Sequence, residues 1–430
     1  MRVHIVGAGP TGMTVAWEIL RSTDHEVIIY DRKSSAGGSW WEPEIETRDL
    51  HAHRIVFDRA FGNTDSMFRE MNIEWDDIFQ PVKSDVYSIV FKNLAFKDYI
   101  TLTGLATKVL MKPSKYKKIS LKSAIGKLSD KGKKLLQTLP FIMDGVDWET
   151  MSAYEFINSF DHVGLSKQYT QRVSGKVMND AMQQALLDKG ATFMFNTHLD
   201  HVEYLDDGYT ATFAGGEVKI DDGLLVLCVD NSKALQLMCH NWGEEALDNV
   251  NYSTYGCINV ILEYDEPIEL ASDLEIAMNT TPILQPVVLS DGKTVSCVIC
   301  DLTEDVLTTH PETLIKTVIE QLELPDPKDA RIGWGAEWKE GKWVFDQSSG
   351  VLSLNEQVPF FGQCKHVALC GMMSPRVTPF SSIEAAVEVG KTFCNKQFGT
   401  RKPHHPLLVT HVLFILIALI LITIYTAKPS

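Results

Sequence analysis

The sequence contains few cysteines and none in its first half, since all eight lie at or after Cys228. We also expect no secretory signal peptide, with its basic segment followed by an apolar one, because MRVHIVGAG already has the pattern of a strand and its turn. Secreted domains that disulfides stabilise are instead rich in cysteine. We therefore expect a reduced intracellular compartment.

Basic side chains are in the minority, with 40 Lys and Arg against 56 Asp and Glu and a net charge of −16. This balance argues against nucleic acid as a general partner. The sequence shows no Ser-His-Asp arrangement and no cluster with metal-ligand spacing, so it predicts no metal site and names no catalytic residue. Cys297 and Cys300 form a CxxC in a run typical of a strand, where positions three apart face opposite sides. We interpret them as core residues rather than a redox pair.

Formal charge is absent from LLVTHVLFILIALILITIY, residues 407–425. A helix of these 19 residues would be about 28 Å long, close to the hydrocarbon thickness of a bilayer. A buried carboxy-terminal helix is the alternative, but the run lacks a polar stripe. Four basic residues precede it and only TAKPS follows, which predicts a tail anchor with the body facing the cytosol.

Acidic residues are scarce in one internal stretch. Residues 108–134 contain ten Lys and one acid, Asp130, hence about +9. Two interpretations stay open: a solvated surface, or a patch that lies on anionic lipid headgroups.

The amino terminus has the order strand, glycine turn, helix, strand. RVHIVGAG predicts a buried strand, and PTGMTVAWEILRS predicts a helix with one apolar face. Gly7 permits the tight turn, Gly9 lets the backbone approach a pyrophosphate, and Gly12 lets helix and strand pack closely. The turn predicts a phosphate-binding site at the start of the helix.

Two further features support a dinucleotide. Ala8, Pro10 and Thr11 complete the turn at the helix amino terminus, which supplies amide donors and partial positive charge. The second strand, HEVIIYD, ends at Asp31, 19 residues after Gly12, where a carboxylate accepts a hydrogen bond from a ribose hydroxyl.

A glycine pair, Gly37 and Gly38, follows in RKSSAGGSWW. With it, the amino-terminal run resembles that of the flavoprotein superfamily of amine oxidases, protoporphyrinogen oxidases and phytoene desaturases, where it binds FAD. The resemblance implies cofactor contacts from Gly38 and Ser39. Many members have Arg after the pair, where this chain has Ser39 and Trp40, so Arg32 is the candidate replacement.

A distant segment, HVALCGMMSPRVTPFSSIEAAVEVGKTFC, resembles the carboxy-terminal FAD segment of the same superfamily. There a strand ends at Gly and a loop leads to a helix of the form xxEGAxxxG. Here the strand ends at Gly371 and the helix starts at Ser382 and Ile383, with Ala385 in place of the usual Gly. The helix amino terminus would stabilise negative charge on reduced flavin. SPRVTPF contains no Cys for covalent attachment, so the implied FAD is noncovalent.

Two internal runs resemble the superfamily less specifically. The run that starts at Lys176 predicts a helix and two strands, and the resemblance implies a backbone contact between Leu199 and the adenine. DLHAHRIVFDRAF, from Asp49, is similar to the desaturase and mutase branches. His53 occupies the position of their histidine, with a structural role favoured over a catalytic one.

The resemblance implies an α/β fold. We expect a doubly wound, glutathione-reductase-like Rossmann domain that binds FAD, built from residues 1–90, 165–255 and 355–400. Residues 90–165 and 255–355 would form an interleaved α+β substrate domain. Residues 401–430 would be a linker and a transmembrane tail.

Three functions follow as hypotheses. The first is a membrane-anchored FAD oxidoreductase, desaturase-like or protoporphyrinogen-oxidase-like, that takes a hydride from an apolar small molecule and passes electrons to oxygen or a quinone. No second GxGxxG is present for NADPH. The second is a flavin amine oxidase, although Ser382 stands where amine oxidases carry an aromatic Tyr. The third is a non-catalytic binding protein that resembles GDI.

Overall fold

The structure is a computed structural model of the 430-residue chain. It describes all residues except 44–47, 51–52, 83–85, 206–207, 215–218, 239–240, 244–251, 347–348, 353–356, 414, 416–418 and 420–430.

A five-stranded sheet with the order β19-β10-β1-β2-β6 forms the centre of one half of the molecule, and each neighbouring pair is parallel. Its strands are β1 (Arg2–Val6), β2 (Glu26–Tyr30), β6 (Thr192–Met194), β10 (Leu224–Leu227) and β19 (Val367–Leu369). They come from the three stretches expected for the FAD-binding domain. The division of the chain into two domains stays a prediction.

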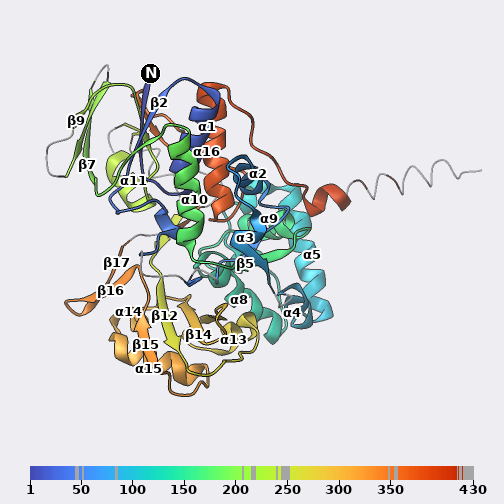
Figure 1. Ribbon diagram of the computed structural model, residues 1–430. Coiled ribbons are helices and arrows are strands. Elements are labelled where there is room, and N and C mark those ends of the chain that lie inside the picture. Colours follow the sequence, from blue (N-terminus) through green and yellow to red (C-terminus); the bar gives the residue numbers. More distant parts are fainter. Residues whose placement is uncertain are drawn as a thin grey trace, which may run out of the picture.

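The two faces of this sheet are covered differently (Figure 1). Val3 and Ile5 of β1 join a core with helices α1 (Pro10–Ser22), α10 (Gly175–Asp188) and α16 (Ile383–Phe398). Alternate residues point to opposite faces, so Val6 joins a second core. That core contains the antiparallel sheet β7 (Leu199–Leu205), β8 (Gly208–Phe213) and β9 (Lys219–Ile220) with α11 (Asn231–Met238). The fold is Rossmann-like α/β, and a small sheet takes the place of most of the second helical layer.

An antiparallel sheet, β13-β14-β12-β15, lies in the other half. Its strands are β12 (Ile258–Glu263), β13 (Leu284–Val288), β14 (Thr294–Ile299) and β15 (Asp329–Ile332), and it packs with α14 (Glu304–Thr308) and α15 (Pro311–Gln321). Shorter pieces complete the strands: β3 (Val56–Phe57), β4 (Phe79–Pro81), β5 (Gln168–Gln171), β11 (Tyr252–Tyr255), β16 (Ala336–Lys339), β17 (Lys342–Phe345) and β18 (Ser349–Leu352).

A helical cluster lies beside that sheet. It comprises α4 (Val86–Lys92), α5 (Phe96–Met111), α6 (Pro113–Tyr116), α7 (Leu121–Ala124), α8 (Asp130–Asp144) and α9 (Ala153–Val163). Leu274 and Met278 of α13 (Asp273–Asn279) enter its core, which joins the cluster to the sheet. Other helices in the described part of the chain include α2 (Gly62–Glu70), α3 (Trp75–Ile78) and the 3₁₀ turn η1 (Gly38–Trp40).

Two sequence predictions can be compared directly with the fold. Cys297 and Cys300, in and just after β14, are buried free thiols, as predicted for core residues. The lysine-rich residues 108–134 run from the end of α5 through α6 and α7 into α8.

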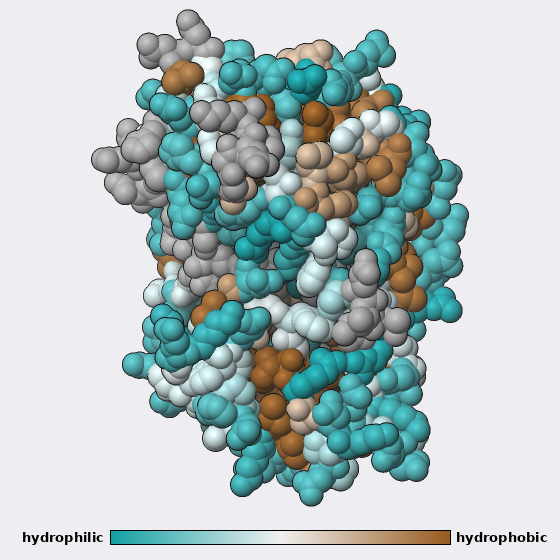
Figure 2. Space-filling view, turned by 60° about the vertical axis from the view of Figure 1, so that its left-hand side comes forward, coloured by the Kyte–Doolittle hydropathy of each residue, from teal (hydrophilic) through white to brown (hydrophobic). Residues whose placement is uncertain are grey.

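The expected span at residues 407–425 lies in part outside the described residues, which omit 414, 416–418 and 420–425. Within the part of the chain that the structure does describe, no helix is both long and apolar enough to cross a membrane. The face of the molecule that Figure 2 brings forward is mostly hydrophilic, with apolar side chains gathered in separate small areas.

Candidate functional site

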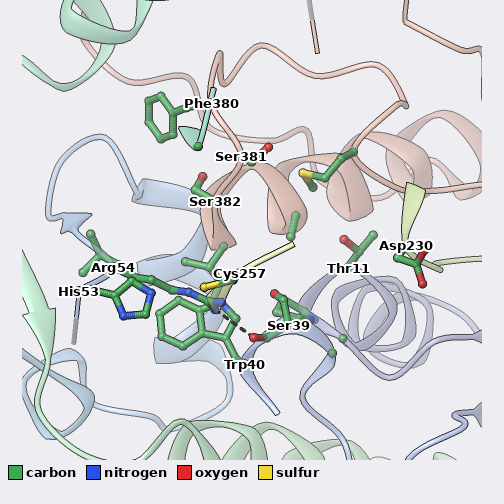
Figure 3. A pocket seen from close by; sticks show the side chains of 18 of the residues that line it. Thr11, Ser39, Trp40, His53, Arg54, Asp230, Cys257, Phe380, Ser381 and Ser382 are labelled. Atoms are coloured by element: carbon green, nitrogen blue, oxygen red, sulfur yellow. Dashed lines mark hydrogen bonds between the residues drawn. The ribbon is translucent and has the colours of Figure 1, made fainter. Parts of the chain in front are cut away.

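One cavity of about 570 Å³ runs between the two halves of the molecule. One end is formed by the glycine turn before α1, the end of β2 and the turn η1. The other end is formed by α4, α8, α9 and the antiparallel sheet. Figure 3 shows Thr11, Ser39 and Asp230 on one side of it, with Ser381 and Ser382 facing them from the start of α16.

The glycine turn packs as its sequence predicts. Gly7 has φ +108°, and a Cβ there would lie 2.2 Å from the Cys228 carbonyl oxygen. A Cβ on Gly12 would lie 1.9 Å from the Gly7 carbonyl oxygen, so only glycine allows this approach of helix to strand. The first intrahelical bond runs from the Met13 N–H to the Gly9 carbonyl. The N–H groups of Thr11 and Gly12 precede it, at the positive end of the helix.

Two glycines that are distant in sequence face each other across the turn. A Cβ on Gly38 would lie 2.7 Å from the Cα of Gly9, and one on Gly9 would lie 3.3 Å from the Cα of Gly38. The Gly37 N–H donates to the Ala8 carbonyl at 2.9 Å. The glycine pair therefore forms a backbone-lined cradle with the first turn, and the cradle opens onto the cavity.

Asp31 closes the cradle from β2. Its carboxylate accepts hydrogen bonds from the Ala8 N–H at 2.7 Å and the Lys33 N–H at 2.8 Å. Burial raises the pKa of Asp31, and the two backbone donors oppose that rise. A carboxylate has further acceptor sites, so Asp31 can still accept from a hydroxyl in the cavity.

Of the fourteen residues predicted to contact the cofactor, the structure brings twelve to the cavity wall. They are Gly7, Gly9, Pro10, Thr11, Asp31, Arg32, Gly38, Ser39, Leu199, Gly371, Ser382 and Ile383. Ala8 and Gly12 do not line it: Ala8 binds Asp31, and Gly12 packs against the strand. Arg32, the candidate replacement for the missing arginine, donates instead to the Asp346 carbonyl.

The amino terminus of α16 is fixed to α2 behind the cavity. The Ser382 hydroxyl caps the helix by accepting from the Ala385 N–H at 3.1 Å. Glu384 accepts from the N–H groups and side chains of Asn63 and Thr64, at 2.7 to 3.0 Å. Burial raises the pKa of Glu384 to about 7. These bonds hold the helix end, and with it Ser382 and Ile383, in place at the cavity.

The loop before α16 is held by buried charges. Glu388 accepts from the Val377 and Thr378 N–H groups, and the Arg376 guanidinium donates to the Thr378 carbonyl. Asp144, at the end of α8, accepts from the Ser381 N–H at 3.2 Å. The helical cluster is thereby tied to the loop that places Phe380 and Ser381 on the cavity wall.

Sequence reasoning missed Arg54 as a site residue. Its guanidinium donates to the Ser39 carbonyl at 3.0 Å and lies 4.9 Å from the centre of the Trp40 ring, which is itself buried (Figure 3). The neighbouring His53 also lines the cavity, and burial, with the Arg54 charge, lowers its pKa to about 3. In the sequence, the run HRIVF was considered only because of His53. Arg54 directly follows that histidine.

The far end of the cavity is largely apolar. Its wall includes Val90, Leu139, Phe141, Ile142, Met143, Phe160, Val163, Leu274, Val298 and Ile299. Cys257 projects its thiol into the middle of the cavity, where the surrounding protein raises its pKa. In the described parts of the chain, no group of three or more His, Cys, Asp or Glu side chains could hold a metal ion.

Comparison with known proteins shows the fold. Residues 5–69 match the model of an NAD(P)-binding Rossmann-like domain. The structure is similar to wild-type putrescine oxidase bound to putrescine, with a TM-score of 0.65 and 14% identity, over 93% of this chain and 99% of that one. It is also similar to a provisionally assigned protoporphyrinogen oxidase from Exiguobacterium sp. 255-15, with a TM-score of 0.59 and 14% identity, over 92% and 98% of the two chains.

An oxidoreductase from Methanosarcina mazei gives a TM-score of 0.58 at 12% identity, over 91% of this chain and all of that one. The search of curated protein sequences finds no match. The chain therefore has, over nearly its whole length, the fold of these oxidoreductases, and its residues 5–69 are similar to an NAD(P)-binding Rossmann-like domain.

Proposed function

We propose that the chain is an FAD-dependent oxidoreductase that removes a hydride from a largely apolar small molecule. The observation that carries this proposal is the single cavity that joins a dinucleotide turn to an apolar wall. The neighbours named above, a putrescine oxidase among them, support an oxidoreductase.

The residues present fit FAD. The cradle of Gly9 and Gly38 is lined by backbone and would be filled by any Cβ, as a pyrophosphate site requires. Thr11 and the α1 amino terminus would hold the phosphates, Asp31 the ribose, and the backbone near Leu199 the adenine. Bound FAD supplies hydride acceptance and onward electron transfer to oxygen or a quinone. Ser382 and Ile383 would bring the positive end of α16 to the ring.

The protein's own contribution is binding and orientation. The apolar wall favours a substrate with little polar surface and excludes water from it. His53 is neutral at physiological pH because its pKa is lowered to about 3, so it can accept a hydrogen bond but does not carry charge. We assign no general base.

The cofactor is tested first. Purified protein should be yellow, and acid precipitation should release all flavin into the supernatant. Flavin that stays in the pellet would contradict noncovalent binding, and colourless protein that does not take up added FAD would support a GDI-like binding role instead. Substrate class is tested next by anaerobic bleaching with polyenes, porphyrinogens, lipids and amines.

An amine is the second candidate substrate. The observation that favours it is Asp273, an acidic residue of α13 on the cavity wall. Its Oδ1 accepts from the Leu274 N–H at 2.8 Å, and the carboxylate could also pair with an ammonium group. If a diamine bleaches the flavin of the wild-type protein but not that of Asp273→Asn, the substrate is an amine.

We also propose that residues 407–425 anchor the protein in a membrane with the body facing the cytosol. The support is the uncharged run itself and the basic residues before it. A tail anchor suits an apolar substrate that partitions into lipid.

A further inference from the structure

Helix α5 exposes large apolar side chains on the side that faces away from its own core. Phe96, Ile100 and Met111 are 81%, 61% and 74% exposed, and Leu110 is exposed as well. At 100° per residue these four positions fall within one arc of the helix, which the exposed Thr103 and Thr107 share. Leu105 and Val109, on the opposite side, are buried in the helical cluster. The helix is thus apolar on two faces, and only one of them is covered.

Phe91 of α4 extends this surface. It is exposed, its ring stacks with Tyr99 of α5 at 6.2 Å, and its carbonyl accepts from the Tyr99 hydroxyl at 2.9 Å. We call Phe91, Phe96, Ile100, Leu110 and Met111 the α5 strip. Scattered exposed apolar residues need no explanation, but five large ones on one side of the molecule, grouped at the two ends of α5 with Thr103 and Thr107 exposed between them, favour an interaction surface.

Lysines border the α5 strip. Lys97, Lys108 and Lys112 are exposed on α5 and just after it, and the lysine-rich residues 108–134 continue from there. This positive edge occurs on a protein whose net charge is −16. Lysine is depleted from protein–protein interfaces, whereas helices that lie in the membrane surface combine lysine with Phe and Leu. The charge and the apolar row together favour an anionic bilayer as the occupant.

The chain leads toward its uncharged tail from the same part of the molecule (Figure 1). The Thr410 N–H and hydroxyl donate to the carboxylate of Asp161 on α9, each at 2.8 Å. α5 packs on the same helix α9. Thr410 therefore holds the start of the uncharged run on the body, and a bilayer that receives the residues after it would lie close to the α5 strip.

The cavity wall adjoins the α5 strip. Val90 of α4 lines the cavity, and the next residue, Phe91, is exposed on the outer surface. One short helix thus separates the apolar end of the cavity from the exposed row.

We propose that α5 lies in the plane of an anionic bilayer. The α5 strip, about 22 Å long on α5 itself, enters the boundary between headgroups and acyl chains. Lys97, Lys108 and Lys112 contact the anionic headgroups. Docking does not depend on the proposed chemistry. If the proposed function holds, the same contact brings the apolar end of the cavity to the lipid.

The test uses the full chain reconstituted in vesicles through its tail. An environment-sensitive fluorophore is attached to Ile100→Cys, and in a matched control to Lys316→Cys on the exposed side of α15. Protein without an introduced cysteine corrects for labelling of native thiols. Vesicles contain phosphatidylcholine alone or phosphatidylcholine with phosphatidylserine.

We expect a blue shift and loss of iodide quenching at position 100, in phosphatidylserine vesicles only, reversed by salt. Position 316 should not change. Lys97→Glu, Lys108→Glu and Lys112→Glu together should remove the shift while flavin absorbance is unchanged.

Three results would overturn the proposal: no shift at position 100, an equal shift without phosphatidylserine, or an equal shift at position 316. A shift that grows with protein concentration in the absence of lipid would assign the α5 strip to a second copy of the chain instead. Flavin absorbance in the same samples reports on the proposed function separately.

Discussion

The Arg54 guanidinium donates a hydrogen bond to the carbonyl oxygen of Ser39, 15 residues earlier in the chain, at 3.0 Å. This contact brings a cation to the glycine pair, next to which many members of the superfamily that the amino-terminal run resembles have an arginine. Arg54 also lines the cavity, so its positive charge lies close to any anion bound there.

We therefore expect Arg54→Met to weaken FAD binding by about ten- to hundredfold, because it removes a positive charge close to the bound diphosphate. Titration of apoprotein with FAD, followed by quenching of flavin fluorescence, measures the effect. Arg59→Met, at an exposed position, is the control. An unchanged dissociation constant in Arg54→Met would show that Arg54 only supports the Ser39 turn.

Gly38→Ala should separate the two turns of the cradle. Its φ of +57° lies in the left-handed region, which costs other residues about 1 kcal/mol. The added Cβ would also meet the Cα of Gly9 at 2.7 Å. We expect a lower melting temperature and nearly colourless protein. Gly104→Ala on α5, where a Cβ meets nothing within 4 Å, should keep its flavin and gain stability. Fully yellow Gly38→Ala protein would contradict the role of the cradle.

The raised pKa of Glu155 predicts that the free energy of unfolding falls as pH rises. Burial raises its pKa to about 8 from 4.5, helped by the nearby Asp144 and opposed by its bonds to Ser152. Between these two values the folded state binds more protons than the unfolded state, so the free energy of unfolding declines with pH, by at most about 1.4 kcal/mol per pH unit. Below about pH 4.5 the contribution of Glu155 to the free energy of unfolding is complete, and above about pH 8 it is lost.

Glu155→Gln keeps the shape of the side chain without the charge, so it should flatten this decline. Melting temperatures from pH 5 to 9 measure it. Glu149→Gln is the control, because Glu149 is exposed and paired with Lys122 on the surface. Parallel curves for wild type and Glu155→Gln would contradict the assignment.

The tail should be removable without loss of the body. The cut belongs after Leu413, because the His404 N–H donates to the Asn63 side chain at 2.6 Å and Thr410 binds Asp161. We expect alkaline carbonate to extract the shortened chain from membranes but not the full chain, with flavin retained in both. Extraction of both would count against a membrane span, and aggregation with loss of flavin would indicate that the segment belongs to the core.

Local sequence determined the parts of the site in which neighbouring residues act together. The turn from Gly7 to Gly12 and the position of Asp31 directly after β2 could be predicted, because steric demands on a backbone turn and on a strand end depend on residues a few positions apart. The same holds for the buried thiols at β14. The start of α16 at Ser382 and Ile383 was expected from the family resemblance, and the structure adds that Ser382 caps the helix and that Ile383 is its first residue.

The tertiary structure alone decided which distant residues share the cavity. Arg54 contacts Ser39 and lines the cavity together with Arg32, and Val90 brings α4 to the cavity wall while Phe91 stays exposed. The sequence of α5 shows apolar residues around most of the helix, and periodicity cannot tell which face the core will cover. That choice depends on packing against α9 and the rest of the helical cluster, so burial of Leu105 and exposure of Phe96 are properties of the whole fold.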